Sequence, residues 1–443
     1  MRMNSDITAL WPTVTPSILI PMIFSLVFCV GMLPLLTELG EMLNSSLIQD
    51  SGEPVPAWVS RIFQGYFYFY VLGSTLPFAL FLFFLSQREA PRSGGGYVPF
   101  VSIIIPAFNE QEAILRGLTG ALNQDYPAYE VIVLDDGSSD FTPYLIESAA
   151  VTFVRMPRNV GKPAALNAGI RAAKGSVLVF SDGDSMLRPS AVRRLVRHFA
   201  DPRIGAVAGR LVLARQDSML RRWQAIEYLF GQTIVKAAQT GSGASALVCP
   251  GPVCAFRRDV LLGLGGFGHD TLVEDFDATL DVIRAGYRVN YEPQAVAETD
   301  SLPSWRALGK QRMRWSRGGL QAARKHLGMF FAPSTGLVGM FWLPYTFLIG
   351  FGGVLLEAVG LVTLPILVLA SGAPLATLKA GLPFIILMEL LAASQYIVTL
   401  FIGRQFKPDL ILAALLIKPF NFFLGWIRLC ALIHELRATK ASW

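Results

Sequence analysis

The sequence contains few of the residues that build disulfide frameworks or zinc centres. Four cysteines and four histidines are spread over 443 residues, and no two cysteines form a CxxC pair. This pattern supports neither a disulfide scaffold nor a zinc site. A zinc-finger spacing, an RNP aromatic pair and a dense basic run are also missing from the sequence, so we expect no nucleic-acid partner.

Charged residues are scarce as well. They make up 16% of the chain, whereas 53% of it is hydrophobic. Soluble proteins rarely carry so little charge, so membrane spans are expected. The formal net charge of +6 is spread along the chain, which fits the cytoplasmic face of a membrane or anionic small molecules.

Long apolar runs lie toward the two ends of the chain. They cover 17–39, 62–85, 336–370, 382–402 and 409–433. Each has about the ~20 residues that a bilayer span needs, so we expect five spans, although 336–370 could also fold as two. Lys418, Asn421 and Arg428 make the last run atypical. The first run is too long for a cleavable signal peptide.

The charges of the loops indicate an orientation. Arg88 and Arg92 follow the second apolar run, while acidic residues lie in the loop before it. The positive-inside rule therefore predicts that the central region is cytoplasmic. Near the C-terminus, five-span and six-span counts place the flanking cations on opposite sides, so the rule does not decide between them there.

The central region alternates short apolar runs with helical patterns. Four such runs occur in order, in "FVSIIIPAFNE", "EVIVLDDGSSD", "VTFVRM" and "SVLVFSDGD". This alternation predicts an α/β domain with a mostly parallel sheet and with ligands at the carboxyl ends of its strands. Polar residues stand at those ends, namely Asn109, Glu110, Asp135, Asp136, Asp182 and Asp184.

Two of these strand ends carry paired acids. In "SDGDSM", Asp182 and Asp184 are one residue apart and could share a Mg²⁺ ion. An ordinary Asp-Gly turn explains the same letters. In "DDGSSD", Asp136 could accept hydrogen bonds from a base or a ribose, whereas the simpler interpretation is a turn with Ser139 or Asp140 as a helix cap.

Two further segments combine a structural and a functional interpretation. In "NVGKPAALNAG", Gly161 and Lys162 could approach a diphosphate, although the Walker spacing is missing and Lys162 could simply be a solvated cation. In "TLVEDFDATLDVIRAG", Glu274 and Asp275 fall in the first turn of a predicted helix that ends at Gly286. The helix dipole favours acids there, and the same position can present a general base to a cleft.

The segment "VCPGPVCAFRRDVL" precedes that helix. Two prolines and a glycine interrupt a stretch of small apolar residues. Such a stretch could form a tight wall under a sugar ring or a loop at the edge of a strand. No histidine lies near Cys254 in the sequence, so we interpret it as a small buried residue and not as a nucleophile.

The stretch "KQRMRWSRGG" lies between the central region and the third apolar run. On a helix, one face combines Gln311, Arg314, Trp315 and Gly318. This face suits a phosphorylated sugar, because Arg forks onto phosphate oxygens, Trp stacks on a pyranose ring and Gln bonds hydroxyls. Arg312 and Arg317 are expected to point elsewhere and to meet lipid headgroups, as they would in a plain interfacial helix.

Seven segments, taken in order, resemble the processive membrane synthases of glycosyltransferase family 2. They are "IIIPAFNE", "VLDDGSSD", "GKPAALNAG", "FSDGD", "GPVCAFRR", "VEDFD" and "QRMRW". The family includes cellulose, hyaluronan and chitin-oligosaccharide synthases. The last segment and "GPVCAFRR" look most similar to the branch that makes poly-β-1,6-N-acetylglucosamine, so this resemblance implies an N-acetylglucosamine polymer as the product. Chitin-type, hyaluronan and β-glucan products stay open, as does transfer of a single sugar to a lipid carrier.

The resemblance implies a cytoplasmic GT-A (Rossmann-like) α/β domain inserted between N- and C-terminal transmembrane helices. Such a protein lies in the inner membrane and transfers sugar from a UDP-sugar donor to a growing polysaccharide. A small membrane subunit, export machinery and membrane lipids are further implied partners. The expected division of the chain is two spans and a linker, the GT-A domain, interfacial helices and about three spans, over 1–97, 98–300, 301–335 and 336–443.

The resemblance also implies roles for single residues. Asp275 would be the general base, with Glu274 beside it, although Val273 stands where the family more often has Thr. Asp182 and Asp184 would hold the donor diphosphate through Mg²⁺ or Mn²⁺. The remaining donor and acceptor contacts would come from Asp135, Asp136 and Lys162 and from the QxxRW residues Gln311, Arg314 and Trp315.

Overall fold

The computed structural model describes residues 76–86, 96–370 and 374–437, together with 38, 61, 65, 73 and 74. The predicted span over 17–39 therefore lies almost wholly outside the described residues. Of the predicted span over 62–85, mainly the second half is described, where α3 runs over Leu76–Ser86.

An eight-stranded sheet forms the centre of the molecule, in the order β3-β2-β1-β4-β7-β6-β8-β5. The four strands expected from the sequence are β1 Val101–Ala107, β2 Tyr129–Asp135, β3 Thr152–Arg155 and β4 Val177–Phe180. They pair in parallel, as predicted. The remaining strands are β5 Met186–Leu187, β6 Ile204–Leu213, β7 Cys254–Arg257 and β8 Arg288–Thr299.

The second half of the sheet corrects the expectation of a mostly parallel arrangement. Strand β7 is antiparallel to both β4 and β6, β5 is antiparallel to β8, and only β6 and β8 pair in parallel there. The sheet is therefore mixed. The sequence did not indicate this, because strand direction depends on how the connecting helices cross the sheet and not on the letters of the strand.

Helices cover both faces of the sheet. Ile103 and Ile105 pack into one apolar cluster and Ile104 into the other, because successive side chains of a strand point to opposite faces. The helices of this region are α4 Ile114–Leu122, α5 Thr142–Glu147, α6 Lys162–Ala172, α7 Ala191–Val196, α10 Arg258–Gly263 and α11 Glu274–Arg284. As predicted, α11 ends just before Gly286, whose φ is +89°.

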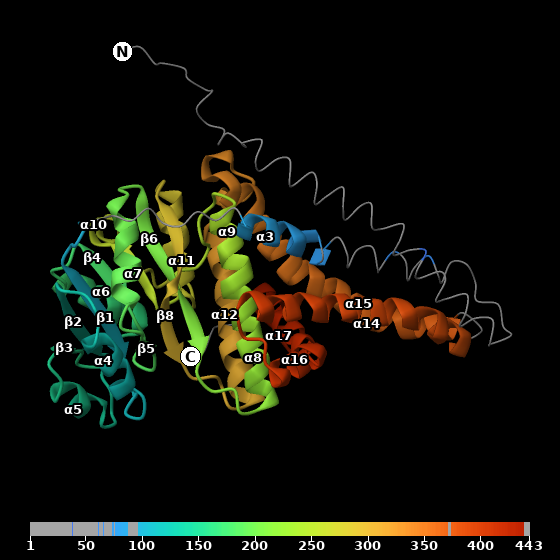
Figure 1. Cartoon of the computed structure of the whole chain (residues 1–443), viewed down its shortest axis with the longest axis horizontal. Coiled ribbons are helices and arrows are strands. Elements are labelled where there is room, and N and C mark those ends of the chain that lie inside the picture. The colour runs from blue at the N-terminus through green and yellow to red at the C-terminus, as the bar shows by residue number, and fades with distance from the viewer. Residues whose placement is uncertain are drawn as a thin grey trace, which may run out of the picture.

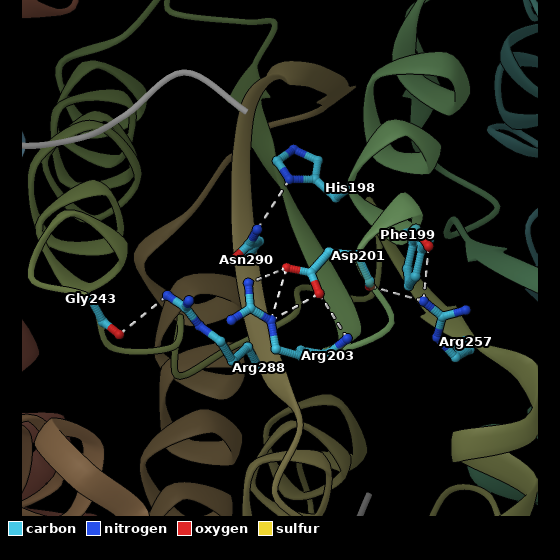
Figure 2. A network of polar contacts seen from close by, with 8 residues as sticks. All are labelled: His198, Phe199, Asp201, Arg203, Gly243, Arg257, Arg288 and Asn290. Carbon is cyan, nitrogen blue, oxygen red and sulfur yellow. Dashed lines mark hydrogen bonds and ion pairs between the residues drawn. The ribbon is translucent and has the colours of Figure 1, made fainter. Parts of the chain in front are cut away.

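A network of polar contacts lies at the end of the sheet where the parallel strands begin, opposite their carboxyl ends (Figure 2). Arg257 ends β7 and pairs with Val177 at the start of β4. Its guanidinium donates to the carbonyls of Phe199 at 2.9 Å and Asp201 at 3.1 Å. A hydrogen bond from Arg203 to the Asp201 carboxylate lowers the pKa of Asp201 to about 2. Arg257 thus joins β7 to the segment that leads into β6, at the end of the sheet away from the site described below.

Two long helices separate the sheet domain from the C-terminal helices (Figure 1). These are α8 Met219–Leu229, which continues through the π-helical turn η4 Phe230–Val235 into α9 Lys236–Gly241, and α12 Trp305–Lys325. Helix α12 packs against α17 Lys418–Leu436, and α8 packs against α16 Pro408–Leu415. Both long helices are thus covered on one side by the C-terminal helices.

The C-terminal helices include candidate membrane spans. Two stretches are long and apolar enough, Val338–Ala370 and Ile385–Ile402, and α16 with α17 forms a third candidate that is bent by 55°. The first stretch contains α13 Leu343–Phe347 and α14 Gly353–Ala370, and the second belongs to α15 Pro374–Ile402. Two or three candidate membrane helices therefore follow the sheet domain.

Lys418, which made the last apolar run atypical, is paired with acids of two other C-terminal helices. Its Nζ lies 2.9 Å from Glu389 of α15 and 3.5 Å from Glu357 of α14. Charges are expensive among apolar helices unless they meet opposite charges. The ion pairs therefore explain how this run tolerates a lysine.

Candidate active site

Lys162 lies at the centre of an acidic pocket at the carboxyl ends of the parallel strands. It begins α6, while Asp182 follows β4 and Glu274 begins α11. Its Nζ is 2.7 Å from Asp182 Oδ1 and 3.2 Å from Glu274 Oε1. Partial burial would by itself lower the pKa of Lys162, but these carboxylates raise it above its ordinary value. Lys162 is thus a paired cation, and the solvated-cation interpretation is wrong.

Asp275 lies in the same pocket, next to Glu274. The walls of this pocket include Lys162, Asp182, Cys249, Gly251, Glu274 and Asp275. The backbone N–H groups of Gly251 and Phe276 donate to the Asp275 carboxylate at 3.3 Å and 2.8 Å. Burial, and then the charge of Glu274, raise the pKa of Asp275 to about 6. A carboxyl group of this kind can exchange protons near neutral pH, as a general base must.

The segment "VCPGPVCAFRR" forms one wall of this pocket. A Cβ added to Gly251 would lie 3.1 Å from Lys162 Nζ and 3.4 Å from Asp182 Oδ1. A glycine therefore allows the backbone to approach the charged groups closely. Cys254 is buried, and burial raises the pKa of its thiol well above the ordinary value. The interpretation of Cys254 as a small buried residue is confirmed.

Two more acids, Asp184 and Glu110, lie near Asp182, which comes just after the end of β4. Burial, and then the neighbouring Asp182, raise the pKa of Asp184, whose Oδ1 accepts a 2.8 Å hydrogen bond from Ser185. Burial and the charges of Asp184 and Asp182 also raise the pKa of Glu110 to about 7. Sequence reasoning placed Glu110 at a strand end but gave it no role. The signal was its position directly after β1, which lies beside β4 in the sheet.

The residues present fit a divalent cation at Asp182 and Asp184. Their carboxylate oxygens are the ligands that Mg²⁺ and Mn²⁺ prefer. Burial, and then the charge of Asp182, raise the pKa of Asp184, and a cation would relieve that repulsion. Asp277, Asp281 and His326 form another group of close potential ligand atoms. Asp277 already accepts from Lys325 and His326, both at 2.8 Å, so that group fits a cation less well.

Asp135 and Asp136 shape the loops after β2. The Asp136 carboxylate accepts the N–H groups of Val160 at 2.8 Å and Gly161 at 2.9 Å. Asp135 is fully buried, and its Oδ1 accepts the N–H of Ser138 at 3.0 Å. Both acids thus have a structural role in the folded chain. A carboxylate oxygen has a second lone pair, so these bonds do not use up the acceptor capacity of either acid.

The turn interpretation of the same segment holds, but neither Ser139 nor Asp140 is the N-cap of α5; that position is Phe141, whose side chain makes no cap hydrogen bond. Asp140 Oδ1 accepts the N–H of Thr142, the first residue of α5, at 3.0 Å. Its other carboxylate oxygen accepts the N–H of Gln111 at 3.2 Å. Asp140 therefore stabilises the turn before α5 and also joins the loop after β2 to the loop after β1.

One face of α12 contacts the segment directly before α11. Arg314 Nη1 donates to the carbonyl of Leu272 at 3.3 Å, and the N–H of Leu272 donates to Gln321 at 3.1 Å. Gly318 lies against the same segment, where an added Cβ would be 2.7 Å from Val273 Cγ1. The helix that carries Gln311, Arg314 and Trp315 is thus held against the start of the helix that carries Glu274 and Asp275.

The expectation that Arg312 and Arg317 meet lipid headgroups is wrong. Both side chains are buried within the protein. Arg312 forms a 2.6 Å ion pair with Glu227 of α8, and Arg317 forms a 2.6 Å ion pair with Glu435 of α17. The reason is that α8 and α17 cover the sides of α12 that the sequence pattern left open.

Tyr228 of α8 packs against the α12 face, and sequence reasoning missed it. Its ring centroid lies 6.4 Å from that of Trp315. Burial raises the pKa of its phenol, and the neighbouring Arg312 opposes that rise. No pattern around Tyr228 in α8 marks it as a site residue, because its role depends on how α8 crosses the sheet domain.

The comparisons with known proteins agree with this geometry. Residues 102–264 match the family model described as "Glycosyl transferase family 2". The chain is 32% identical over 224 residues to a poly-β-1,6-N-acetyl-D-glucosamine synthase of Staphylococcus aureus, covering 49% of this chain and 54% of that protein. It is also 32% identical over 259 residues to the probable glycosyltransferase YdaM of Bacillus subtilis, covering 55% of this chain and 61% of that protein. The matches thus span between about half and three fifths of these relatives.

A solved structure shares the fold. The mannosyltransferase PcManGT from Pyrobaculum calidifontis, in complex with GDP-Man and Mn²⁺, superposes with a TM-score of 0.58 at 22% identity. The superposition covers 86% of this chain and 99% of that one. The mixed sheet is therefore a GT-A-like domain. Residues 102–264 thus match glycosyltransferase family 2, and the chain is similar over about half its length to relatives named as glycosyltransferases and polysaccharide synthases.

Proposed function

We propose that the chain is a membrane-bound, inverting and processive glycosyltransferase that polymerises N-acetylglucosamine from UDP-N-acetylglucosamine through β-1,6 linkages. The observation that carries the proposal is the pocket in which Lys162, Asp182, Glu274 and Asp275 meet beside the QxxRW helix. The name of the Staphylococcus aureus relative supports the sugar and the linkage. The candidate membrane helices support a membrane location, with the GT-A domain on the cytoplasmic side.

Asp275 is the general base of the proposed reaction. Its carboxylate accepts the proton of an acceptor hydroxyl while that oxygen attacks the anomeric carbon of the donor from the side opposite UDP. The bond from the anomeric carbon to the UDP oxygen breaks, and UDP leaves with the electron pair. An α-linked donor therefore gives a β-linked product. Glu274 is paired with Lys162 at 3.2 Å, so its charge is partly balanced while Asp275 takes the proton.

The diphosphate of the donor is held by the other side of the pocket. Asp182 and Asp184 would hold Mg²⁺ or Mn²⁺, which when bound supplies positive charge for the leaving diphosphate. Lys162 fixes the orientation of Asp182 through their 2.7 Å hydrogen bond. Arg314 adds guanidinium donors suited to phosphate oxygens. Asp135 and Asp136 complete the donor site at the end of β2, where Asp136 contacts the uridine.

The α12 face binds the acceptor. Trp315 is partly exposed and offers an aromatic ring for a pyranose, and Gln311 offers an amide for its hydroxyls. The division of the chain follows the proposal, with the GT-A domain over 98–300, interfacial helices over 301–335 and membrane helices over 1–97 and 336–443. Membrane lipids, a small membrane subunit and export machinery are the proposed partners.

Product analysis tests the proposal. The full chain, purified and placed in lipid nanodiscs, is incubated with single nucleotide sugars, and the release of UDP or GDP is measured. We expect turnover with UDP-N-acetylglucosamine and a product that is cut by a β-1,6-N-acetylglucosaminidase. Turnover only with another donor, or a product cut only by chitinase or hyaluronidase, would overturn the assigned sugar or linkage. A labelled monosaccharide in the lipid extract would instead indicate a lipid-carrier glycosyltransferase.

The rate should depend on pH through Asp275. Because the pKa of Asp275 is raised to about 6, the carboxyl stays protonated, and inactive as a base, up to a higher pH than an ordinary aspartate. We expect a plateau above neutral pH and a rate that falls about tenfold for each pH unit below the pKa. Initial rates of UDP release at saturating donor and constant ionic strength measure this. An acid limb near pH 4 would contradict the assignment.

Lys162 should strengthen the binding of the donor. Replacing Lys162 with Met leaves Asp182 and Glu274 without their shared counter-ion, and the repulsion between these acids and the donor phosphates then rises. Lys162 is partly exposed, so solvent weakens its ion pairs and their loss costs less than the loss of a fully buried pair would. We therefore expect UDP to bind at least about tenfold more weakly. Titration calorimetry with UDP measures this. Lys174→Met, which removes an exposed cation beyond the end of α6, is the control and should bind UDP normally.

A further inference from the structure

Arg312 contacts two residues of the proposed acceptor face at once. It follows Gln311 in the chain, and its Nη1 donates to Gln311 Oε1 at 3.1 Å. Its guanidinium carbon lies 4.2 Å from the ring centroid of Trp315. A guanidinium over an indole ring gains a cation–π interaction, which is stronger when water is excluded. One buried side chain thus touches both the amide and the indole.

Arg312 is itself held in place from α8. Its Nη2 is 2.6 Å from Glu227 Oε2, and its side chain is only 6% exposed. The guanidinium also lies 5.5 Å from the ring centroid of Tyr228, the residue after Glu227. The acid and the aromatic ring of α8 therefore fix where the guanidinium lies, and the guanidinium in turn contacts α12.

The partly exposed Trp315 depends on this arrangement. Its side chain is 37% exposed, so burial alone does not fix the indole in one orientation. In the part of the chain that the structure describes, Arg312 and Tyr228 lie against its ring. A lysine at position 312 would keep the charge but lose the planar fork that can bond an acid and an amide while stacking on a ring.

We propose that Arg312 is a positioning residue that orients Trp315 and Gln311 for the acceptor sugar through its ion pair with Glu227. The inference rests on the proposed function, because it takes the α12 face as the acceptor site. Arg312 acts through its two neighbours and need not touch the substrate. This positioning role replaces the expectation that Arg312 contacts lipid headgroups.

The first test compares Arg312→Lys with Arg324→Lys, an exposed arginine near the end of the same helix. The acceptors are short β-1,6-linked N-acetylglucosamine oligosaccharides. We expect Arg312→Lys to raise the acceptor KM or lower kcat/KM for the acceptor by up to about 10²-fold, as for a displaced binding group. UDP affinity should stay within about twofold, because the donor residues are not touched. Arg324→Lys should match the unsubstituted chain.

A second test does not depend on activity. The fluorescence of Trp315 is obtained as the difference between each protein and its Trp315→Phe counterpart, and its quenching by acrylamide is measured. We expect Arg312→Lys to change this quenching, and Glu227→Gln to change it in the same direction by less. In kcat/KM for the acceptor, Arg312→Lys and Trp315→Phe together should cost clearly less than the product of the single effects.

Unchanged quenching together with an additive double variant would overturn the inference. So would a loss of UDP affinity equal to the loss of acceptor affinity, because that indicates general damage to the fold. If the unsubstituted chain elongates no oligosaccharide, the proposed function fails. The quenching measurement then still decides whether Arg312 orients Trp315.

Discussion

Asp275→Asn is expected to lower the rate of sugar transfer by about 10²–10⁴-fold, the range that a general base contributes. Asn has nearly the same shape, so it can keep the hydrogen bond from the N–H of Gly251, but it cannot take the proton of the acceptor hydroxyl. The donor site loses none of its contacts. The measurement is UDP release and polymer formation by the purified chain, alongside UDP affinity, which should change little.

The matched control for this substitution lies on the same helix. Asp281→Asn removes a carboxylate of α11 that pairs with Arg284 at the surface of the domain. Such pairs contribute little to stability, so the transfer rate should stay close to that of the unsubstituted chain. Near-normal polymerisation by Asp275→Asn would exclude Asp275 as the base. An equal loss in both variants would show that the helix, and not the carboxylate, is what transfer requires.

Gly318→Ala is expected to reduce transfer by about 10²-fold, although Gly318 touches no substrate group. A Cβ at this position would lie 2.7 Å from Val273 Cγ1 and 3.1 Å from the backbone carbon of Leu272. The valine is β-branched and cannot easily turn away, so the segment before α11 must move. Glu274 and Asp275 follow directly, and a shift of about 1 Å in a reacting group can cost about 10²-fold in rate.

The neighbouring glycine provides the control. A Cβ added to Gly319 meets nothing within 4 Å, and both substitutions change helix propensity alike, in the stabilising direction by up to about 1 kcal/mol. Gly319→Ala should therefore transfer sugar normally. Transfer rates and thermal unfolding of both variants are the measurements. Normal transfer by Gly318→Ala would mean that the contact between α12 and the segment before α11 does not position the base.

Local patterns predicted the first half of the sheet correctly. The apolar runs of β1 to β4 are short and bounded by turn residues, so both their existence and their parallel pairing could be inferred. The start of α11 and its end before Gly286 were equally clear, since acids at the first turn and glycine after the last are local signals. The antiparallel β7 was not predicted, because "CAFR" alone does not show which way the chain enters the sheet.

The sequence also singled out the charged residues of the pocket but not their partners. Lys162 was interpreted both as a diphosphate ligand and as a solvated cation, and only the fold showed that it contacts Asp182 and Glu274, about 20 and 112 positions away in the chain. Glu110 and Tyr228 carry no local signal of comparable strength. Their neighbours come from β4 and α12, and such contacts between distant segments leave no periodic pattern.

By itself, the sequence determined the alternating strands and helices of the central region, the apolar runs at the ends, and the acids that end the strands. These follow from local periodicity and turn chemistry, which a single chain displays directly. Only the tertiary structure decided the mixed sheet, the environment of Asp275 and the burial of Arg312 and Arg317. The physical reason is that strand direction, the polarity around a carboxyl group and the partner of a cation all depend on segments far apart in the chain.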